Sequence, residues 1–213
     1  MIKRHIPNAI TCGNLLCGCL AIVKAFEGDL VWAAYLVGIA LVLDFFDGFT
    51  ARLLKVASPI GKDLDSLADM VTFGVVPGVV MYQMISLAEN LSLGFRSYQP
   101  TEFHYLHYTA FIIPVFSAIR LAKFNNDTRQ SDSFIGVPTP ANAMFICSIP
   151  LIYNLGGAHS SVHFLDENPY VLCLVSLIMS LLLVAPLPLL ALKFKNFGWA
   201  DNKMRFILIG LVV

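Results

Sequence analysis

The stretch LVWAAYLVGIALVLDFFDGFTARLL, residues 30–54, decides the class of fold. A helix needs about 20 mostly apolar residues to cross the hydrocarbon core of a bilayer, and this stretch is long enough. Its charged residues are Asp44, Asp47 and Arg52, all in its second half. The sequence therefore predicts a transmembrane helix, Leu30–Leu54, that carries two carboxylates inside the membrane.

The composition of the whole chain agrees with a membrane protein. Of its 213 residues, 57% are apolar and 13% are charged, whereas soluble domains have roughly 45–50% and about 25%. The 14 basic and 14 acidic side chains balance, and the mean hydropathy is +0.74. This composition excludes a nucleic-acid binder with a basic surface, a disordered chain and a disulfide-stapled secreted module. We expect one domain, residues 1–213.

Outward from residues 30–54, the hydrophobic pattern predicts an all-α, polytopic bundle of six transmembrane helices. Pro114 and Pro150 predict kinks or tilts in the fourth and fifth helices. The final stretch, Phe206–Val213, is too short to cross a bilayer and is consistent with the beginning of a further span. The six predicted spans are Asn8–Phe26, Leu30–Leu54, Leu64–Leu87, Tyr105–Lys123, Pro140–Leu155 and Tyr170–Leu192.

The distribution of basic residues predicts the orientation. If the N-terminus is cytoplasmic, all the lysines and arginines except Lys24 and Arg96 fall on the inner side, as the positive-inside rule requires. Acidic residues, Glu89 among them, then fall in the outer connections. Four histidines also fall there, and we interpret them as surface or interfacial residues: His104, His107, His159 and His163.

Four aspartates lie where the bilayer disfavours charge. Asp44 and Asp47 are inside the second span, and Asp65 and Asp69 are in the first turns of the third. Each charge costs at least about 2.5 kcal/mol near the bilayer centre. A short link containing Pro59 joins the two helices, so they are antiparallel neighbours whose carboxylate faces converge. Clustered carboxylates suit hard cations such as Mg²⁺, Mn²⁺ or Ca²⁺, and two such ions would offset four charges.

Two other interpretations of these aspartates remain open at this point. They could form an ordinary polar bundle interior, or they could relay cations or protons in a transporter. The clustering beside the cytoplasmic face favours a binding site instead. Gly48 and Ala51 leave room beside the carboxylates for a ligand, and Arg52 is placed to meet a phosphate.

The spacing of these residues resembles the signature of the CDP-alcohol phosphatidyltransferase family. The resemblance implies a helical membrane enzyme, a divalent metal cofactor and a homodimer. It also implies that Asp44, Asp47 and Asp65 bind the metals, and that Asp69 is the catalytic base and a further metal contact. The matching positions are Asp44-x₂-Asp47-Gly48-x₂-Ala51-Arg52-x₈-Gly61-x₃-Asp65-x₃-Asp69.

The same resemblance implies a binding site for a CDP-lipid such as CDP-diacylglycerol. Gly48 and Ala51 would lie against the cytidine, and Arg52 near a phosphate. Asn8 and Thr11 match a nucleotide-binding pattern of the family, although both could instead cap the first helix. The residues that we expect to bind the CDP-lipid are Asn8, Thr11, Gly48, Ala51, Arg52 and Gly61.

Three further segments resemble the bacterial and archaeal members of the family that use L-serine as the acceptor: Ser66–Gly78, Arg120–Asn125 and Phe134–Ala143. Arg120 and Lys123 are then candidates for binding the serine carboxylate, with help from Asn125. Inositol phosphate and glycerol 3-phosphate remain alternative acceptors. We expect an integral protein of a prokaryotic cytoplasmic membrane, with its active site facing the cytoplasm.

Overall fold

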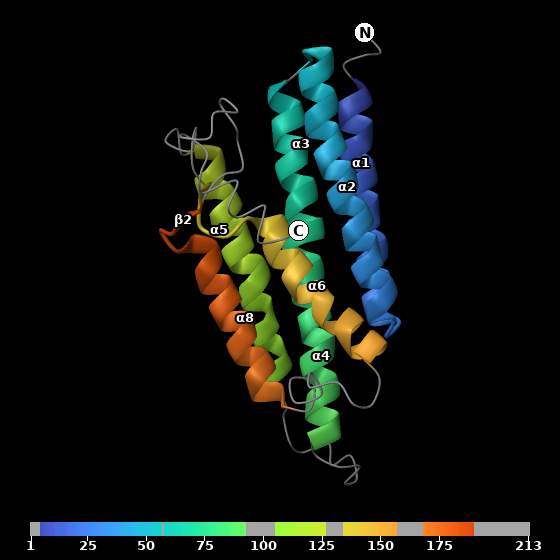
Figure 1. Ribbon diagram of the computed structural model, residues 1–213, viewed down its shortest axis with the longest axis vertical. Coiled ribbons are helices and arrows are strands. Elements are labelled where there is room, and N and C mark those ends of the chain that lie inside the picture. Colours follow the sequence, from blue (N-terminus) through green and yellow to red (C-terminus); the bar gives the residue numbers. More distant parts are fainter. Residues whose placement is uncertain (1–4, 57, 93–104, 127–133, 157–167, 190–213) are drawn as a thin grey trace, which may run out of the picture.

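The computed structural model describes residues 5–56, 58–92, 105–126, 134–156 and 168–189. These residues form a helical bundle with one pair of two-residue strands (Figure 1). We call the end of the bundle where the N-terminus lies the upper end. The opposite end, where α4 (Val76–Ser92) finishes and α8 (Pro169–Val184) begins, is the lower end.

The first two helices form a close hairpin. α1 (His5–Phe26) descends from the upper end and α2 (Leu30–Leu54) returns to it. Gly28 permits the tight turn with its φ of +83°, and the side chain of Asp29 caps α2 by accepting from the amide of Trp32 at 3.1 Å. Small residues such as Ala21 and Ala33 are buried between the helices. They let the two backbones approach closely.

The third helix is the central element of the bundle. α3 (Pro59–Asp69), the π-helical turn η2 (Met70–Val75) and α4 (Val76–Ser92) follow one another without a break. Ser58 caps α3, accepting from the amide of Gly61 at 3.1 Å. The apolar span of this helix is 61% buried, against 28% for the spans of α1 and α2, because it packs against α1, α5, α6 and α8.

The remaining helices pack around the lower part of this central helix. The 3₁₀ helix η3 (Leu106–Phe111) leads into α5 (Ile112–Asn126), and α6 (Thr139–Gly156) contacts α2 while α8 contacts α5. A two-residue strand, β1 (Phe134–Ile135), pairs antiparallel with β2 (Pro188–Leu189). This pair holds the segment before α6 against the end of α8.

The all-α membrane architecture predicted from the sequence is confirmed. Within the described ranges, three helical stretches are long and apolar enough to cross a membrane: His5–Phe26, Leu30–Leu54 and Pro59–Asn90. The second has the predicted bounds, whereas the third extends beyond the predicted span, Leu64–Leu87, at both ends. Pro114 lies in the first turn of α5, where its missing N–H removes no helical hydrogen bond.

The predicted end of the sixth span is wrong. The helix ends at Val184, and Ala185 is already extended. Pro186 and Pro188 follow, and neither can donate the hydrogen bond that would continue the helix. The predicted stretch Phe206–Val213 lies outside the described residues.

Candidate active site

Three of the four predicted aspartates meet at the upper end of the bundle. The side chains of Asp44, Asp47 and Asp65 each offer an oxygen, and these oxygens lie within 4.8 Å of one another. Asp47 is only 5% exposed, and the other two are partly buried. α2 supplies the first two and α3 the third, so the antiparallel arrangement predicted from the short link brings the carboxylates together.

Asp69 completes the cluster. The carboxyl group of Asp44 is within hydrogen-bonding range of the carboxyl groups of both Asp65 and Asp69. The Oδ1 atom of Asp69 is buried and has no hydrogen-bond partner among the residues that the structure describes. Four carboxylates thus converge from α2 and α3. We call them the aspartate cluster.

The aspartate cluster has no basic partner in ion-pair contact among the residues that the structure describes. Carboxylates so close together repel one another, and an unpartnered buried oxygen is costly. A set of oxygen ligands with excess negative charge and one vacant acceptor is what Mg²⁺, Mn²⁺ or Ca²⁺ requires. The residues present therefore fit a divalent cation.

The residues of the site lie at two depths along the bundle. α1 and α3 run away from the upper end and α2 runs toward it, so Thr11, Asp47 and Asp65 lie at about the same depth. Asp44 and Asp69 lie about 5 Å deeper, which is one helical turn. The hydroxyl of Thr11 donates to Oδ2 of Asp47 at 2.6 Å, which ties α1 to the upper part of the cluster.

Asn14 is a candidate residue that the sequence analysis missed. It is fully buried, and neither polar atom of its side chain has a hydrogen-bond partner in the part of the chain that the structure describes. Its backbone carbonyl oxygen accepts from the hydroxyl of Thr72 in η2 at 3.3 Å. Asn14 follows Thr11 by three residues and so lies about one turn below it. The available signal was the spacing of Thr11, Asn14 and Gly18 at i, i+3 and i+7, which places Asn14 on the same helix face as Thr11.

The predicted CDP-lipid residues gather around the same end. A Cβ atom on Gly61 would lie 3.2 Å from Oδ1 of Asn8, so α1 and α3 approach closely at this glycine. A Cβ atom on Gly48 would meet nothing closer than the Arg52 guanidinium at 4.0 Å, so the space beside Gly48 is open. Arg52 is exposed, and its Nε donates to the Gly48 carbonyl at 3.0 Å.

Of the three predicted acceptor residues, Arg120 has the strongest link to the aspartate cluster. It is 7% exposed, and its charge acts on Asp69. Its Nε donates to the carbonyl of Val137 at 2.6 Å. Asn125 instead donates to the hydroxyl of Ser66 at 2.9 Å, tying α5 to α3, and Lys123 is exposed.

The π-helical turn directly after Asp69 was not predicted. Here α1 contacts η2 so closely that a Cβ atom on Gly18 would collide with Oγ1 of Thr72. π-helical turns often accompany functional sites. Here the turn separates the polar segment that carries Asp65 and Asp69 from the apolar α4.

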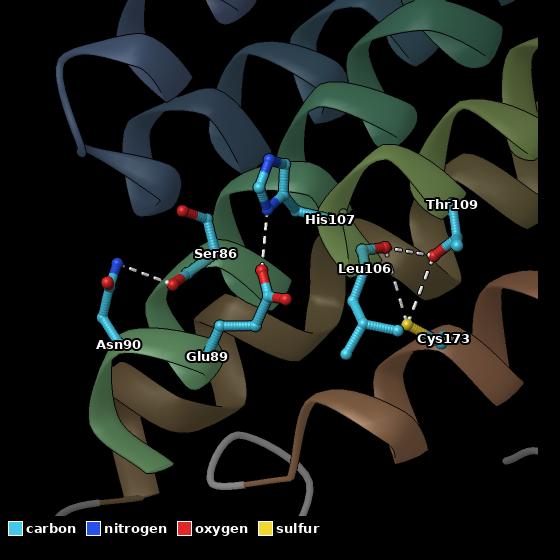
Figure 2. A network of polar contacts seen from close by, with 7 residues as sticks. All are labelled: Ser86, Glu89, Asn90, Leu106, His107, Thr109 and Cys173. Atoms are coloured by element: carbon cyan, nitrogen blue, oxygen red, sulfur yellow. Dashed lines mark hydrogen bonds and ion pairs between the residues drawn. The ribbon is translucent and has the colours of Figure 1, made fainter. Parts of the chain in front are cut away.

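The lower end holds a second polar cluster (Figure 2). Nδ1 of His107 lies 2.7 Å from Oε2 of Glu89, and the two side chains are 14% and 6% exposed. The edge of the imidazole also packs on Tyr82, with ring centroids 4.9 Å apart. Thr109 reaches Cys173 of α8 at 3.2 Å.

This pairing corrects two predictions. His107 is not a surface residue, and Glu89 is not in an outer loop. α4 continues to Ser92, so Glu89 is on a helix face that packs against η3. We call Glu89 and His107 the lower pair.

Comparison with known proteins identifies close relatives. The profile of the CDP-alcohol phosphatidyltransferase family matches residues 4–191. The chain is 34% identical over 208 residues to the CDP-diacylglycerol–serine O-phosphatidyltransferase of Helicobacter pylori, covering 97% of this chain and 78% of that protein. It is 34% identical over 150 residues to the Bacillus subtilis protein of the same name, covering 70% and 77%. The Methanocaldococcus jannaschii protein of that name is 30% identical over 149 residues.

Proposed function

Because the chain belongs to the CDP-alcohol phosphatidyltransferase family, we propose that it transfers the phosphatidyl group of CDP-diacylglycerol to the hydroxyl of L-serine and releases CMP. The chain is an integral membrane enzyme, a transferase. The observation that carries the proposal is the convergence of four carboxylates, without a basic ion-pair partner among the described residues, at the family's signature positions. A transferase site accounts for these carboxylates, so cation transport is not needed to explain them.

The aspartate cluster fits divalent cations that would meet the donor. Asp44, Asp47 and Asp65 would hold the ions, of which we propose two, and Asp69 would be a further ligand. Bound Mg²⁺ or Mn²⁺ would neutralise the pyrophosphate and stabilise the charge that shifts to the leaving group. The open space beside Gly48 admits the cytidine, and Asn8, Thr11, Ala51 and Gly61 complete its surroundings, with Arg52 near a phosphate.

Asp69 activates the acceptor. Its carboxylate takes the proton of the serine hydroxyl. The serine oxygen then forms a bond to the phosphorus that carries the diacylglycerol, the bond from that phosphorus to the bridging oxygen breaks, and CMP leaves with the electron pair. No covalent enzyme intermediate is required, so the protein contributes mainly positioning and electrostatic stabilisation.

Arg120 attracts the carboxylate of serine. It is nearly fully buried, and it is close enough for its charge to act on Asp69. An anion held there would place its neighbouring hydroxyl beside the proposed base. Lys123 and Asn125, which the sequence also suggested, have weaker support, because the first is exposed and the second bonds Ser66.

The upper end faces the cytoplasm in this proposal. Serine and CMP then exchange with the cytosol, and the two-tailed donor enters from the inner leaflet of a prokaryotic cytoplasmic membrane. The excess of basic residues on that side supports the orientation. We further propose that the enzyme acts as a homodimer of single-domain chains, as the family resemblance implies.

An acceptor panel tests the proposed function. Purified enzyme in detergent receives CDP-diacylglycerol and Mn²⁺ with serine, inositol, inositol phosphate or glycerol 3-phosphate, and CMP release is measured. We expect rapid release with serine and background release with the others. Faster release with either phosphorylated acceptor than with serine would contradict serine as the substrate.

A further inference from the structure

The first turn of α6 contains buried polar side chains without hydrogen-bond partners among the described residues. Thr139 and Asn142 are fully buried. In this part of the chain, the hydroxyl of Thr139 and both amide atoms of Asn142 form no hydrogen bond. The two residues are three apart and therefore on one helix face. Buried polar atoms are nearly always partnered, so an unpartnered set calls for an explanation such as a ligand.

This turn lies beside the aspartate cluster. α6 begins partway down the central helix, not at the upper end where α3 begins (Figure 1). It packs against η2, the segment that directly follows Asp69. Arg120 donates to the carbonyl of Val137, two residues before Thr139, while its charge acts on Asp69. One basic group thus links the start of α6 to the proposed base.

The side chains of Arg120, Thr139 and Asn142 together suit a zwitterionic ligand. A guanidinium, a hydroxyl and an amide N–H are donors that suit a carboxylate. The positive end of the α6 dipole adds to the attraction for an anion. The amide oxygen of Asn142 is an acceptor that suits an ammonium group. Both unpartnered atoms of Asn142 would then be satisfied by one amino acid.

We propose that Thr139 and Asn142, together with Arg120, bind the carboxylate and ammonium groups of the acceptor amino acid beside Asp69. This inference rests on the proposed function and assigns its acceptor site. It accounts for recognition of the ammonium by a neutral amide. It also accounts for the polar, proline-flanked start of α6 being held within the bundle instead of at its surface.

Steady-state kinetics of two variants test the proposal. CMP release is measured for Thr139→Val and Asn142→Ala, varying serine at saturating CDP-diacylglycerol and then the reverse. Loss of a hydrogen bond to a charged group weakens binding by about tenfold or more, so we expect the KM for serine to rise by that factor. The KM for CDP-diacylglycerol should change by less than about twofold, since these residues do not contact the donor.

A matched control is Ser180→Ala. Ser180 is also fully buried, and its hydroxyl has no partner among the described residues, but it is on α8, which packs against α5 and α4. We expect both KM values of this variant to equal those of the wild type. An equal rise in its KM for serine would show a general packing effect and overturn the proposal.

Serine methyl ester separates the carboxylate from the rest of the acceptor. Wild type should use the ester less efficiently than serine, and Thr139→Val should lose little further efficiency with the ester. An equal loss with both acceptors would remove Thr139 from the carboxylate site.

If wild type uses serine but neither variant changes its KM for serine, the assignment of the acceptor site is wrong and the proposed function stands. If wild type does not use serine, the proposed function itself fails. Thr139→Val keeps the side-chain volume, so it carries the test if Asn142→Ala does not fold.

Discussion

Buried acidic residues have different neighbours at the two ends of this bundle. At the lower end, Glu89 lies 2.7 Å from His107, whose imidazole also packs edge-to-face with Tyr82. At the upper end, Asp44, Asp65 and Asp69 face one another, and Arg120 acts on Asp69 without ion-pair contact. Asp65, Asp69 and Glu89 all belong to the same central helix, so the difference lies in their neighbours and not in the helix.

The comparison separates a structural role from a binding role. A buried acid that contacts a partner from a neighbouring element stabilises the packing of the two elements. A cluster of acids that repel one another destabilises the empty protein and is retained where a ligand compensates for it. Neutralising an acid should therefore have opposite effects at the two ends.

The largest effect is expected for Asp69→Asn. The amide cannot accept the serine proton, so CMP release should fall by about 10²–10⁴-fold, while binding of CDP-diacylglycerol remains largely intact. CMP release and equilibrium binding of the donor are the measurements. Asp63→Asn is the control, because Asp63 is exposed on the same helix. Normal turnover by Asp69→Asn would remove Asp69 as the base.

The second-largest effect is expected for His107→Leu, which breaks the lower pair. It removes the imidazole that contacts Glu89, and this should lower the free energy of unfolding by about 2–3 kcal/mol. The kcat of the folded fraction should stay near that of the wild type, since the pair is at the end opposite the aspartate cluster. Denaturation in detergent and CMP release measure the two quantities.

The control for the lower pair is Glu27→Gln, which breaks the exposed pair between Lys24 and Glu27. Exposed pairs contribute little to stability, so no measurable change is expected. If His107→Leu also unfolds no earlier than the wild type, the lower pair has no structural role and the comparison between the two ends is lost.

The smallest effect is expected for Gly61→Ala. The added methyl would lie 3.1 Å from Oγ of Ser58 and 3.2 Å from Oδ1 of Asn8, so Asn8 must shift slightly. We expect the KM for CDP-diacylglycerol to rise about three- to tenfold, a cost near 1 kcal/mol, with the KM for serine unchanged. Gly38→Ala is the control, because open space surrounds that position. Equal donor KM values in the two variants would argue against Asn8 as a donor contact.

Much of the site could be predicted because it depends on local spacing. Residues 30–54 predict α2 from length and hydropathy alone, and the intervals between Asp44, Asp47, Asp65 and Asp69 follow helix periodicity. The short, proline-containing link then requires antiparallel helices. These features need no knowledge of distant contacts.

The features that were missed depend on packing between distant segments. The π-helical turn accompanies the close approach of Gly18 to Thr72, which no local pattern reveals. The lower pair requires α4 to continue past the apolar run and meet η3. Burial of Asn14, Thr139 and Asn142 follows from where α1 and α6 contact the central helix. The spacing of Asn14 after Thr11 could suggest a shared helix face, but it could not show that this face is buried.

The most direct test of the central claim is the thermal stability of the metal-free protein on addition of Mn²⁺. Chelator-treated wild type and Asp65→Asn are heated in detergent, without substrates, at increasing Mn²⁺ concentrations. The account predicts that Mn²⁺ raises the Tm of wild type, because the ion binds the folded aspartate cluster, and that Asp65→Asn loses most of this rise. It also predicts that metal-free Asp65→Asn is at least as stable as metal-free wild type, since one repelling charge is gone. A Tm of wild type that does not respond to Mn²⁺ or Mg²⁺ would contradict the claim that the aspartate cluster is a cation site.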